Sequence, residues 1–284
     1  MLKKWRLWGS CLLLVALIMG AVVWTQSRPS RVQTTPATTN HVAQSPQHDS
    51  ATTTLAEKPW TKLKHPLKLP ILMYHSISTG NQLRVPLQQF DREMTYLKRH
   101  HYRTLTTDEA IRALTTNTVP QKKVVWITLD DAYRDNLKIL PILRKNHQHV
   151  TINAITGFTT KRNHLSLAAM RRMRDTGRVD FDSHTTNHLD LTTLSAKQQR
   201  TELADSKNWL DTKFDQDTRL LCYPAGRNNA TTRHLAKKTG YTLALTTREG
   251  VAQLSQGRYS LERLRIAPGM SLAAFASVVN VKNN

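Results

Sequence analysis

Two neighbouring aspartates, Asp130 and Asp131, end an apolar run in the segment "ITLDDAYRDN" at residues 127–136. Adjacent carboxylates repel one another, so a buried strand rarely ends on such a pair unless something stabilises the charge. Two histidines, His184 and His188, follow in "SHTTNH", with a spacing that brings both imidazoles to one side of a helix or tight turn. A divalent cation bound by both histidines and one aspartate would explain the acid pair, because its charge lowers the cost of the second carboxylate.

A metal site with two histidines and one aspartate leaves coordination positions open for water and substrate. That is the arrangement of a catalytic metal site rather than a structural one. The second aspartate would then be free to act as a base. Each pattern alone has a simpler explanation, because histidine pairs are common on surfaces and an acid pair after a strand often caps a helix. Their coincidence with His75 and "YPAG" (223–226) at other predicted strand ends favours a functional site.

Strand-like and helix-like segments alternate from residue 67 onward. The strand candidates are 69–77, 102–105, 122–131, 150–157, 178–184, 218–226 and 241–247. The helix candidates are 86–101, 106–116, 134–146 (interrupted by Pro141), 166–177, 195–214 and 229–240. This alternation predicts an α/β fold with a parallel sheet or barrel. In such folds the catalytic residues gather at the C-terminal ends of the strands, where the polar residues named above lie.

The N-terminal segment differs from the rest of the chain. Lys3, Lys4 and Arg6 precede an uncharged apolar stretch at 7–24, which is long enough to cross a bilayer. We expect an uncleaved membrane anchor at 1–24 with its N-terminus in the cytoplasm, and a cleaved signal peptide is the alternative. Residues 25–66 are rich in Thr, Ser, Gln, Pro and Ala and predict a disordered linker. The domain at 67–284 would then lie outside the cell, attached to its membrane by a single pass.

The chain is strongly basic, with 41 Lys and Arg against 20 Asp and Glu. This charge suggests an anionic neighbour. No nucleic-acid-binding module accompanies it, so we expect an acidic wall or membrane surface and no nucleic acid. The two cysteines, Cys11 and Cys222, lie far apart and exclude both a disulfide framework and a cysteine-based zinc site.

Several segments resemble a known family. "TLDDAYRDN", "SHTTNHLDL" and "CYPAGRNN" resemble three motifs of the NodB-type polysaccharide deacetylases, carbohydrate esterase family 4. "PILMYHSI" and "FDREMTYLKRHHYRTLTTDE" resemble the subgroup that deacetylates poly-β-1,6-N-acetylglucosamine, an exopolysaccharide of biofilms. The resemblance covers 67–284 and implies a distorted (β/α) barrel. It also implies a hydrolase that removes N-acetyl groups from N-acetylglucosamine units of an extracellular polysaccharide.

The resemblance also implies roles for single residues. Asp131, His184 and His188 would bind a divalent metal, usually zinc. Asp130 would be the general base that activates water, and His75 the general acid that protonates the leaving amine.

Further residues follow from the third motif and from departures from the family pattern. The oxyanion and the substrate would meet the segment Tyr223, Pro224, Ala225 and Gly226, with the Ala225 amide as oxyanion donor. Ala132 stands where most members have glycine. The third-motif arginine that orients the base is not evident, and Arg263 in "LERLRI" is a candidate replacement in a second shell.

Two other functions stay open at this point. One is a deacetylase for peptidoglycan or a chitin-like oligomer, with the same site and a different groove. The other is a non-catalytic glycan-binding wall protein whose basic surface acts instead of a reaction centre. The complete set of acids and histidines argues against the second alternative.

Overall fold

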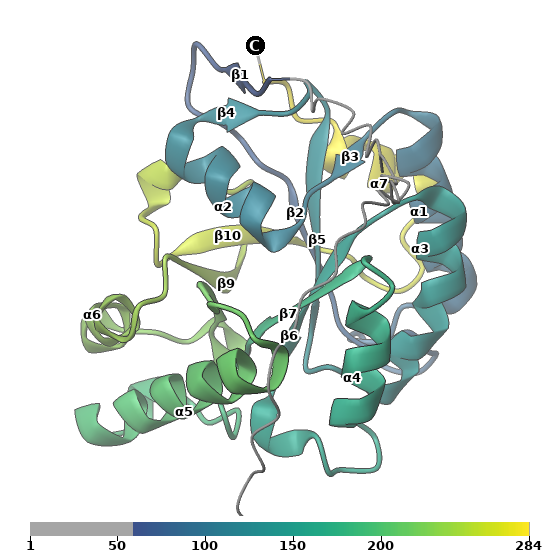
Figure 1. Cartoon of the computed structure of the whole chain (residues 1–284). Coiled ribbons are helices and arrows are strands. Elements are labelled where there is room, and N and C mark those ends of the chain that lie inside the picture. Colours follow the sequence, from purple (N-terminus) through teal and green to yellow (C-terminus); the bar gives the residue numbers. More distant parts are fainter. Residues whose placement is uncertain (1–58, 284) are drawn as a thin grey trace, which may run out of the picture. The chain divides into compact units, whose positions relative to one another are not determined.

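A computed structural model describes residues 59–283 of the protein. Seven parallel strands form a barrel in the order β2-β10-β9-β8-β7-β6-β5, and β5 pairs back onto β2 to close it (Figure 1). The short β3 extends the sheet beyond β5. The barrel strands are β2 (Ile71–Tyr74), β5 (Val124–Asp130), β6 (Val150–Ala154), β7 (Val179–Ser183), β8 (Leu220–Cys222), β9 (Leu243–Glu249) and β10 (Leu261–Arg265), and β3 is Arg103–Thr104. This confirms the predicted α/β fold and its barrel.

Most of the helices connect strands and cover the outside of the barrel, whereas buried side chains of the helix at Thr107–Thr116 belong to the same cluster as the barrel interior. The helices are α1 (Leu87–Arg99), α2 (Thr107–Thr116), α3 (Leu140–Asn146), α4 (Leu167–Arg174), α5 (Ala196–Phe214), α6 (Ala230–Thr239) and α7 (Leu272–Val279). Short 3-10 turns lie at Arg134–Ile139 (η1), Thr156–Phe158 (η2), Leu191–Thr193 (η3), Pro224–Gly226 (η4) and Leu254–Gln256 (η5). The helix predicted at 134–146 is therefore a 3-10 turn followed by α3, with Pro141 in the first turn of α3 where it costs no hydrogen bond.

Among the described residues, secondary structure starts earlier in the chain than the sequence predicts. The linker was expected to reach residue 66, but β1 (Thr61–Lys62) already pairs antiparallel with β4 (Thr118–Val119). The Trp60 ring, partly buried, lies against the Arg112 guanidinium at 4.2 Å. The expected anchor at 1–24 and the linker up to residue 58 lie outside the described residues. Within residues 59–283, no helix combines the length and the apolar character needed to cross a bilayer.

The C-terminal part contains two elements that the sequence patterns do not reveal. β10 completes the barrel between β9 and β2, and α7 packs its buried Phe275 and Val279 against the outer core. The sequence "LERLR" of β10 lacks the apolar run of a buried parallel strand, because an arginine occupies one of its inward positions. That arginine is Arg263, which is fully buried.

The alternation of side chains along β5 determines what the barrel encloses. Val125, Ile127 and Leu129 belong to the core beneath the outer helices, whereas Trp126 belongs to the cluster inside the barrel. Because side chains alternate along a strand, Thr128 and Asp130 share the inner face with Trp126. The strand therefore changes from apolar to acidic along its inner face and carries Asp130 into the interior at its C-terminal end.

Candidate metal centre and active site

Asp130 lies inside the barrel in a dense set of hydrogen bonds. Arg263 donates from Nη1 to Asp130 Oδ1 at 2.8 Å and from Nη2 to Asp130 Oδ2 at 2.7 Å, a two-point ion pair. Asn153 Nδ2 on β6 donates to Asp130 Oδ1 at 2.8 Å. Burial alone would raise the pKa of the Asp130 carboxyl, but the Arg263 guanidinium outweighs that effect and holds the pKa well below its usual value. Asp130 is therefore a buried carboxylate that stays deprotonated.

Arg263 is itself fixed on all sides. Its Nε donates to the Thr246 carbonyl oxygen at 2.8 Å, and its Nη1 also donates to Thr128 Oγ1 at 3.1 Å. Its Nη2 lies 3.2 Å from Cys222 Sγ. These contacts satisfy a guanidinium with no solvent exposure, as a buried charge requires. The structure thus places the expected replacement arginine in direct contact with the expected base.

Asp131 faces a different set of partners because the backbone turns sharply after β5. Asp131 and Ala132 have φ values of 73° and 55°, in the left-handed region that non-glycine residues seldom adopt. The turn carries the Asp131 carboxylate to the rim, where its Oδ1 lies 3.5 Å from His184 Nε2 and 3.5 Å from His188 Nε2. The potential ligand atoms of these three residues all lie within 4.8 Å of one another.

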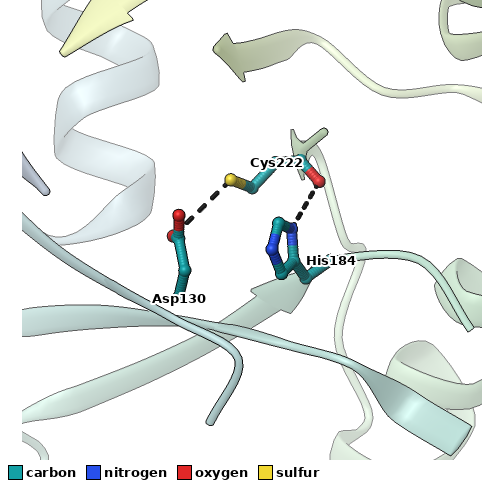
Figure 2. Close-up of side chains that lie close together, drawn as sticks. All are labelled: Asp130, His184 and Cys222. Atoms are coloured by element: carbon teal, nitrogen blue, oxygen red, sulfur yellow. Dashed lines mark hydrogen bonds between the residues drawn. The ribbon is translucent and has the colours of Figure 1, made fainter. Parts of the chain in front are cut away.

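The tautomer of His184 leaves its Nε2 free to bind a metal. Its Nδ1 lies 2.8 Å from the Cys222 carbonyl oxygen, which can only accept a hydrogen bond, so Nδ1 carries the proton (Figure 2). In the neutral ring, Nε2 then keeps its lone pair and points at Asp131. A hydrogen bond from the ring nitrogen that does not bind the metal commonly fixes the orientation of a metal-binding histidine.

The electrostatics of this trio favour a positive charge between its members. Burial would lower the pKa of His184, but Cys222 and the Asp131 carboxylate outweigh burial and raise that pKa well above its ordinary value. Burial and the neighbouring His184 lower the pKa of His188. A proton or a divalent cation can therefore occupy the space that the three side chains share, and the residues fit a metal.

A second group of potential ligands, Asp130, His184 and Cys222, lies deeper. Figure 2 shows that Cys222 bonds to both other residues: its Sγ lies 3.5 Å from Asp130 Oδ1, and its backbone carbonyl oxygen accepts from His184 Nδ1 at 2.8 Å. Both Asp130 oxygens and the Cys222 sulfur also face Arg263, whose positive charge opposes a cation there. The trio of Asp131, His184 and His188 is the better metal site. Cys222 had no predicted role here, because a lone cysteine in a sequence carries no positional signal.

The loop that carries His184 and His188 is held by one acid from α5. Glu202 is buried and accepts hydrogen bonds from the amides of Thr186 and Asn187, at 3.1 and 2.8 Å, and from Asn187 Nδ2 at 2.7 Å. Sequence reasoning missed Glu202, since nothing in its helix marks it except that it falls on the buried face. It stabilises a loop whose backbone is strained, with φ values of 64° at Thr185 and 57° at His188.

His75 follows β2 and faces the base. Its Nε2 lies 3.8 Å from Asp130 Oδ2. The segment after the aspartate pair fixes it, because Asn136 Nδ2 donates to the His75 carbonyl oxygen at 2.9 Å and Asp135 accepts the Ile77 amide at 2.9 Å. Burial lowers the pKa of His75, against the opposing effect of Asp130, so its imidazole is neutral at rest near pH 7.

The third-motif segment contributes backbone rather than side chains. The Tyr223 ring is fully buried in the cluster beneath α5 and α6, and its hydroxyl donates to the Tyr259 carbonyl oxygen at 3.2 Å. The Tyr223 side chain is therefore part of the core, and the role predicted for this segment in binding the oxyanion and the substrate stays a prediction. Pro224 is also buried, whereas Ala225 is exposed at the turn with φ 50°. Gly226 has φ 70°, and a Cβ there would meet Thr247 Oγ1 at 2.3 Å, so only glycine fits.

Comparison with known proteins gives one consistent result. Residues 117–244 match the family model for polysaccharide deacetylases. The chain is 40% identical over 272 residues, covering 95% of both chains, to YxkH of Bacillus subtilis, a candidate polysaccharide deacetylase. It is 27% identical over 196 residues (63% of this chain, 67% of the relative) to the poly-β-1,6-N-acetyl-D-glucosamine N-deacetylase of Staphylococcus epidermidis. The structure of the Streptococcus pyogenes deacetylase PplD, in complex with acetate, aligns with a TM-score of 0.73 at 38% identity, over 76% of this chain and all of that one.

The buried pair of Asp130 and Arg263 generates a stability prediction. Arg263→Met leaves the Asp130 charge buried and unpaired, and we expect the free energy of unfolding to fall by about 3–5 kcal/mol. Arg265→Met, two residues along the same strand and only half-buried, is the matched control and should change stability much less. The double variant Asp130→Asn/Arg263→Met should regain part of the loss, because no unpaired charge remains. Chemical denaturation of the four proteins measures this, and a double variant no more stable than Arg263→Met would contradict it.

Proposed function

The chain belongs to the polysaccharide deacetylase family, and on that premise we propose that it hydrolyses N-acetyl groups of N-acetylglucosamine units in a polysaccharide outside the cell. The observation that carries this proposal is the meeting of a deprotonated Asp130, a neutral His75 and the trio Asp131, His184 and His188 at one end of the barrel. A binding protein would have no need for two carboxylates and three imidazoles whose protonation states differ so strongly over so short a distance.

We infer that the trio binds a divalent metal, zinc by the nature of its ligands. When bound, the metal supplies a Lewis acid that polarises the acetamide carbonyl and makes a water molecule more acidic. Asp131, His184 and His188 are the three protein ligands in this proposal.

Asp130 and His75 would move the proton. Asp130 accepts it from the attacking water, since Arg263 keeps the carboxylate ionised inside the barrel. Arg263 also makes Asp130 a weak base, so Asp130 does not retain the proton. His75, with Nε2 3.8 Å from Asp130 Oδ2, is positioned to receive it and to donate it to the amide nitrogen. The water oxygen first forms a bond to the acetamide carbon. The C–N bond then breaks as the carbonyl re-forms, so that the products are acetate and an amine that carries the proton from His75.

We assign the Ala225 amide to the developing oxyanion. It lies in a turn at the end of β8, and η4 closes that turn through the Gly226 amide, which donates to the Tyr223 carbonyl oxygen at 2.8 Å. The Pro224 carbonyl shares a peptide plane with the Ala225 amide, and it accepts a hydrogen bond from the Arg227 amide at 3.0 Å, which further fixes that plane. A rigid backbone donor of this kind needs no reorganisation as charge develops.

Two polymers are candidates for the substrate. Poly-β-1,6-N-acetylglucosamine is favoured by the "MYHSI" segment that carries His75 and by the similarity to the Staphylococcus epidermidis enzyme. A wall glycan such as peptidoglycan is favoured by the basic charge of the chain, because acidic wall polymers would concentrate near it. Acetate release from a panel of both glycans by the purified protein decides between them.

We propose that residues 1–24 anchor the enzyme to the cell membrane, with the catalytic domain outside. The support is the uncharged stretch 7–24 and its basic N-terminal flank. The mature protein should fractionate with membranes and begin at its original N-terminus. A soluble product whose N-terminal sequence starts after Trp24 would instead establish a cleaved signal peptide.

The metal assignment predicts different outcomes for the two aspartates. His184→Ala and Asp131→Asn should lose both bound zinc and acetate release. Asp130→Asn should keep the zinc while its kcat falls at least ~10²-fold, the smallest loss typical of a missing general base. Because the pKa of His184 is raised, protons should compete with zinc, so zinc affinity should weaken as the pH falls below that pKa.

Metal analysis after dialysis and acetate assays measure these effects. His234→Ala, on the exposed side of α6, is the control and should change neither. Loss of zinc from Asp130→Asn together with its retention in Asp131→Asn would mean that Asp130 is the metal ligand and Asp131 the base. Full activity of His184→Ala would show that the proposed metal site is wrong.

The role of His75 predicts a loss of rate without a loss of structure. His75→Ala should lower kcat by ~10²–10⁴-fold, the usual contribution of proton transfer, with zinc content and melting temperature nearly unchanged. Added imidazole should restore part of the rate, because it can carry the proton in place of the missing side chain. His149→Ala, which removes the partner of Asp180 at 3.0 Å, is the structural control and should lower stability without imidazole rescue. Activity of His75→Ala within a few-fold of wild type would assign the proton return to Asp130 alone.

A further inference from the structure

A basic pocket lies beside the candidate active site. It is a hollow of about 270 Å³ between the β6–α4 loop, η1 and α4. The helix α4, which borders it, is labelled in the lower part of Figure 1. Four cationic side chains line it, Arg134, Lys161, Arg162 and Arg172, together with the mostly buried His164 and with Ser166, and no acidic residue lines it. This basic pocket has no part in the reaction described above.

Backbone hydrogen bonds attach the basic pocket to the catalytic rim. The Arg134 amide donates to the Asn163 carbonyl oxygen at 2.9 Å, and the Leu165 amide donates to the Ala132 carbonyl oxygen at 2.8 Å. On the other side, the Gly157 amide donates to the Thr186 carbonyl oxygen at 2.9 Å, in the loop of the metal-binding histidines. The His164 ring stacks on Tyr133 with 5.3 Å between ring centroids, two residues after Asp131. The pocket therefore adjoins the place where the acetamide would be bound.

The charge of this region is largely unbalanced within the described part of the protein; Lys145 pairs with Asp91 at 3.2 Å, but it does not line the basic pocket. Residues 136–174 contain eight Lys and Arg and no Asp or Glu. Across residues 59–283, no carboxylate lies within ion-pair distance of any of the four cations of the basic pocket. The neighbouring Asp135 turns away, since it accepts hydrogen bonds from Ser76 Oγ at 2.6 Å and from the Ile77 amide at 2.9 Å.

The first turn of α4 adds to the positive electrostatic potential in the basic pocket. Ser166 caps this helix by accepting the Ala169 amide at 3.3 Å, and both residues line the basic pocket. The N-terminus of a helix carries partial positive charge. Four cations gathered in one hollow repel one another, and a bound anion would relieve that repulsion.

We propose that the basic pocket is a subsite for an anionic group of the substrate, a phosphate or a carboxylate on the glycan near the acetylated sugar. The proposal rests on the deacetylase function proposed above and narrows its substrate class to acidic glycans. Arginine guanidinium groups bind such anions through two parallel hydrogen bonds, which would fix the register of the polymer against the reaction centre. The same cations would repel the amine of the product and disfavour a polymer that is already partly deacetylated and hence cationic.

The test compares matched oligomers on the full-length protein. Three N-acetylglucosamine oligomers of equal length are needed: a neutral one, one with a phosphate on the neighbouring unit, and one with a lactyl carboxylate there. At low salt the wild-type protein should bind and turn over the anionic oligomers about 3–10-fold better through a lower KM, because partly exposed charge pairs give modest energies each. The advantage should disappear at high salt, because ions screen exposed charges. The phosphate and carboxylate arms identify which anion the pocket prefers.

A variant with Arg134, Lys161, Arg162 and Arg172 all changed to Gln should lose the preference. Its kcat on the neutral oligomer should stay within about two-fold of wild type, since none of these side chains reaches the reacting atoms. The matched control changes Lys98, Lys197, Lys237 and Lys238 to Gln, which removes the same charge from exposed positions on α1, α5 and α6. This control should keep the preference, and calorimetric binding of the phosphate oligomer should weaken only in the first variant.

The outcomes separate the subsite from the deacetylase function. Acetate release at equal rates from neutral and anionic oligomers would overturn the subsite and leave the deacetylase intact. The subsite proposal would also be overturned if the basic-pocket variant and the surface-lysine control lost the preference for anionic oligomers equally. In that case the net charge of the protein, and not the pocket, would cause the preference. Absence of acetate release from all three oligomers would overturn the deacetylase proposal. In that case the binding difference between the two variants still decides whether the basic pocket binds an anion.

Discussion

The buried ion pair between Asp130 and Arg263 is the interaction on which the rest of the site depends. It joins β5 to β10 across the inside of the barrel, between strands separated by more than a hundred residues in the chain. A carboxylate at this depth would ordinarily become neutral, because desolvation penalises its charge. The guanidinium reverses this, and Thr246 and Thr128 in turn hold the guanidinium. Removing Arg263 leaves the Asp130 charge with weaker compensation, from the Asn153 hydrogen bond and the neighbouring histidines His75 and His184.

The two adjacent aspartates have different roles because the backbone separates them. Asp130 follows the alternation of β5 into the barrel, whereas the left-handed conformation at Asp131 and Ala132 carries the second carboxylate to the rim. An alanine at φ 55° is strained compared with a glycine, and the contacts around it must maintain that turn. The Leu165 amide, which donates to the Ala132 carbonyl oxygen, is one such contact. Strain of this kind persists only where the surroundings over-determine the conformation.

The charge of the protein is distributed in a way that matches its proposed substrate. The acids of the site are buried, paired or aimed at the histidines, so that the open surface beside them is left to lysines and arginines. The region between η1 and α4 shows this most clearly, since it carries cations alone. A neutral polymer would gain nothing from such a rim, whereas an acidic wall glycan would be attracted and aligned by it. The basic pocket thus links the overall charge of the chain to a particular place beside the candidate metal centre.

The sequence by itself determined most of the elements, although not β1, β4, β10 and α7, and it predicted the residues of the candidate site. Apolar strands that alternate with amphipathic helices predict a β/α barrel, and in such a barrel the ends of β2, β5 and β7 must meet at one rim. His75, Asp130, Asp131, His184 and His188 could therefore be identified from their spacing and from the family resemblance. The sequence did not show that the Tyr223 side chain, in the segment predicted to meet the oxyanion and the substrate, lies in the core beneath α5 and α6.

Only the tertiary structure decided which residues support the site. β10 was not recognisable because its inward position holds an arginine, and that residue becomes stable there only beside Asp130. Glu202 and Cys222 have no local signal, since their contacts join segments 15 to 92 residues apart. The basic pocket likewise forms from three elements whose cations are dispersed along the chain. Local patterns record propensity and periodicity, whereas compensation of buried charge and the gathering of surface charge depend on contacts between distant residues.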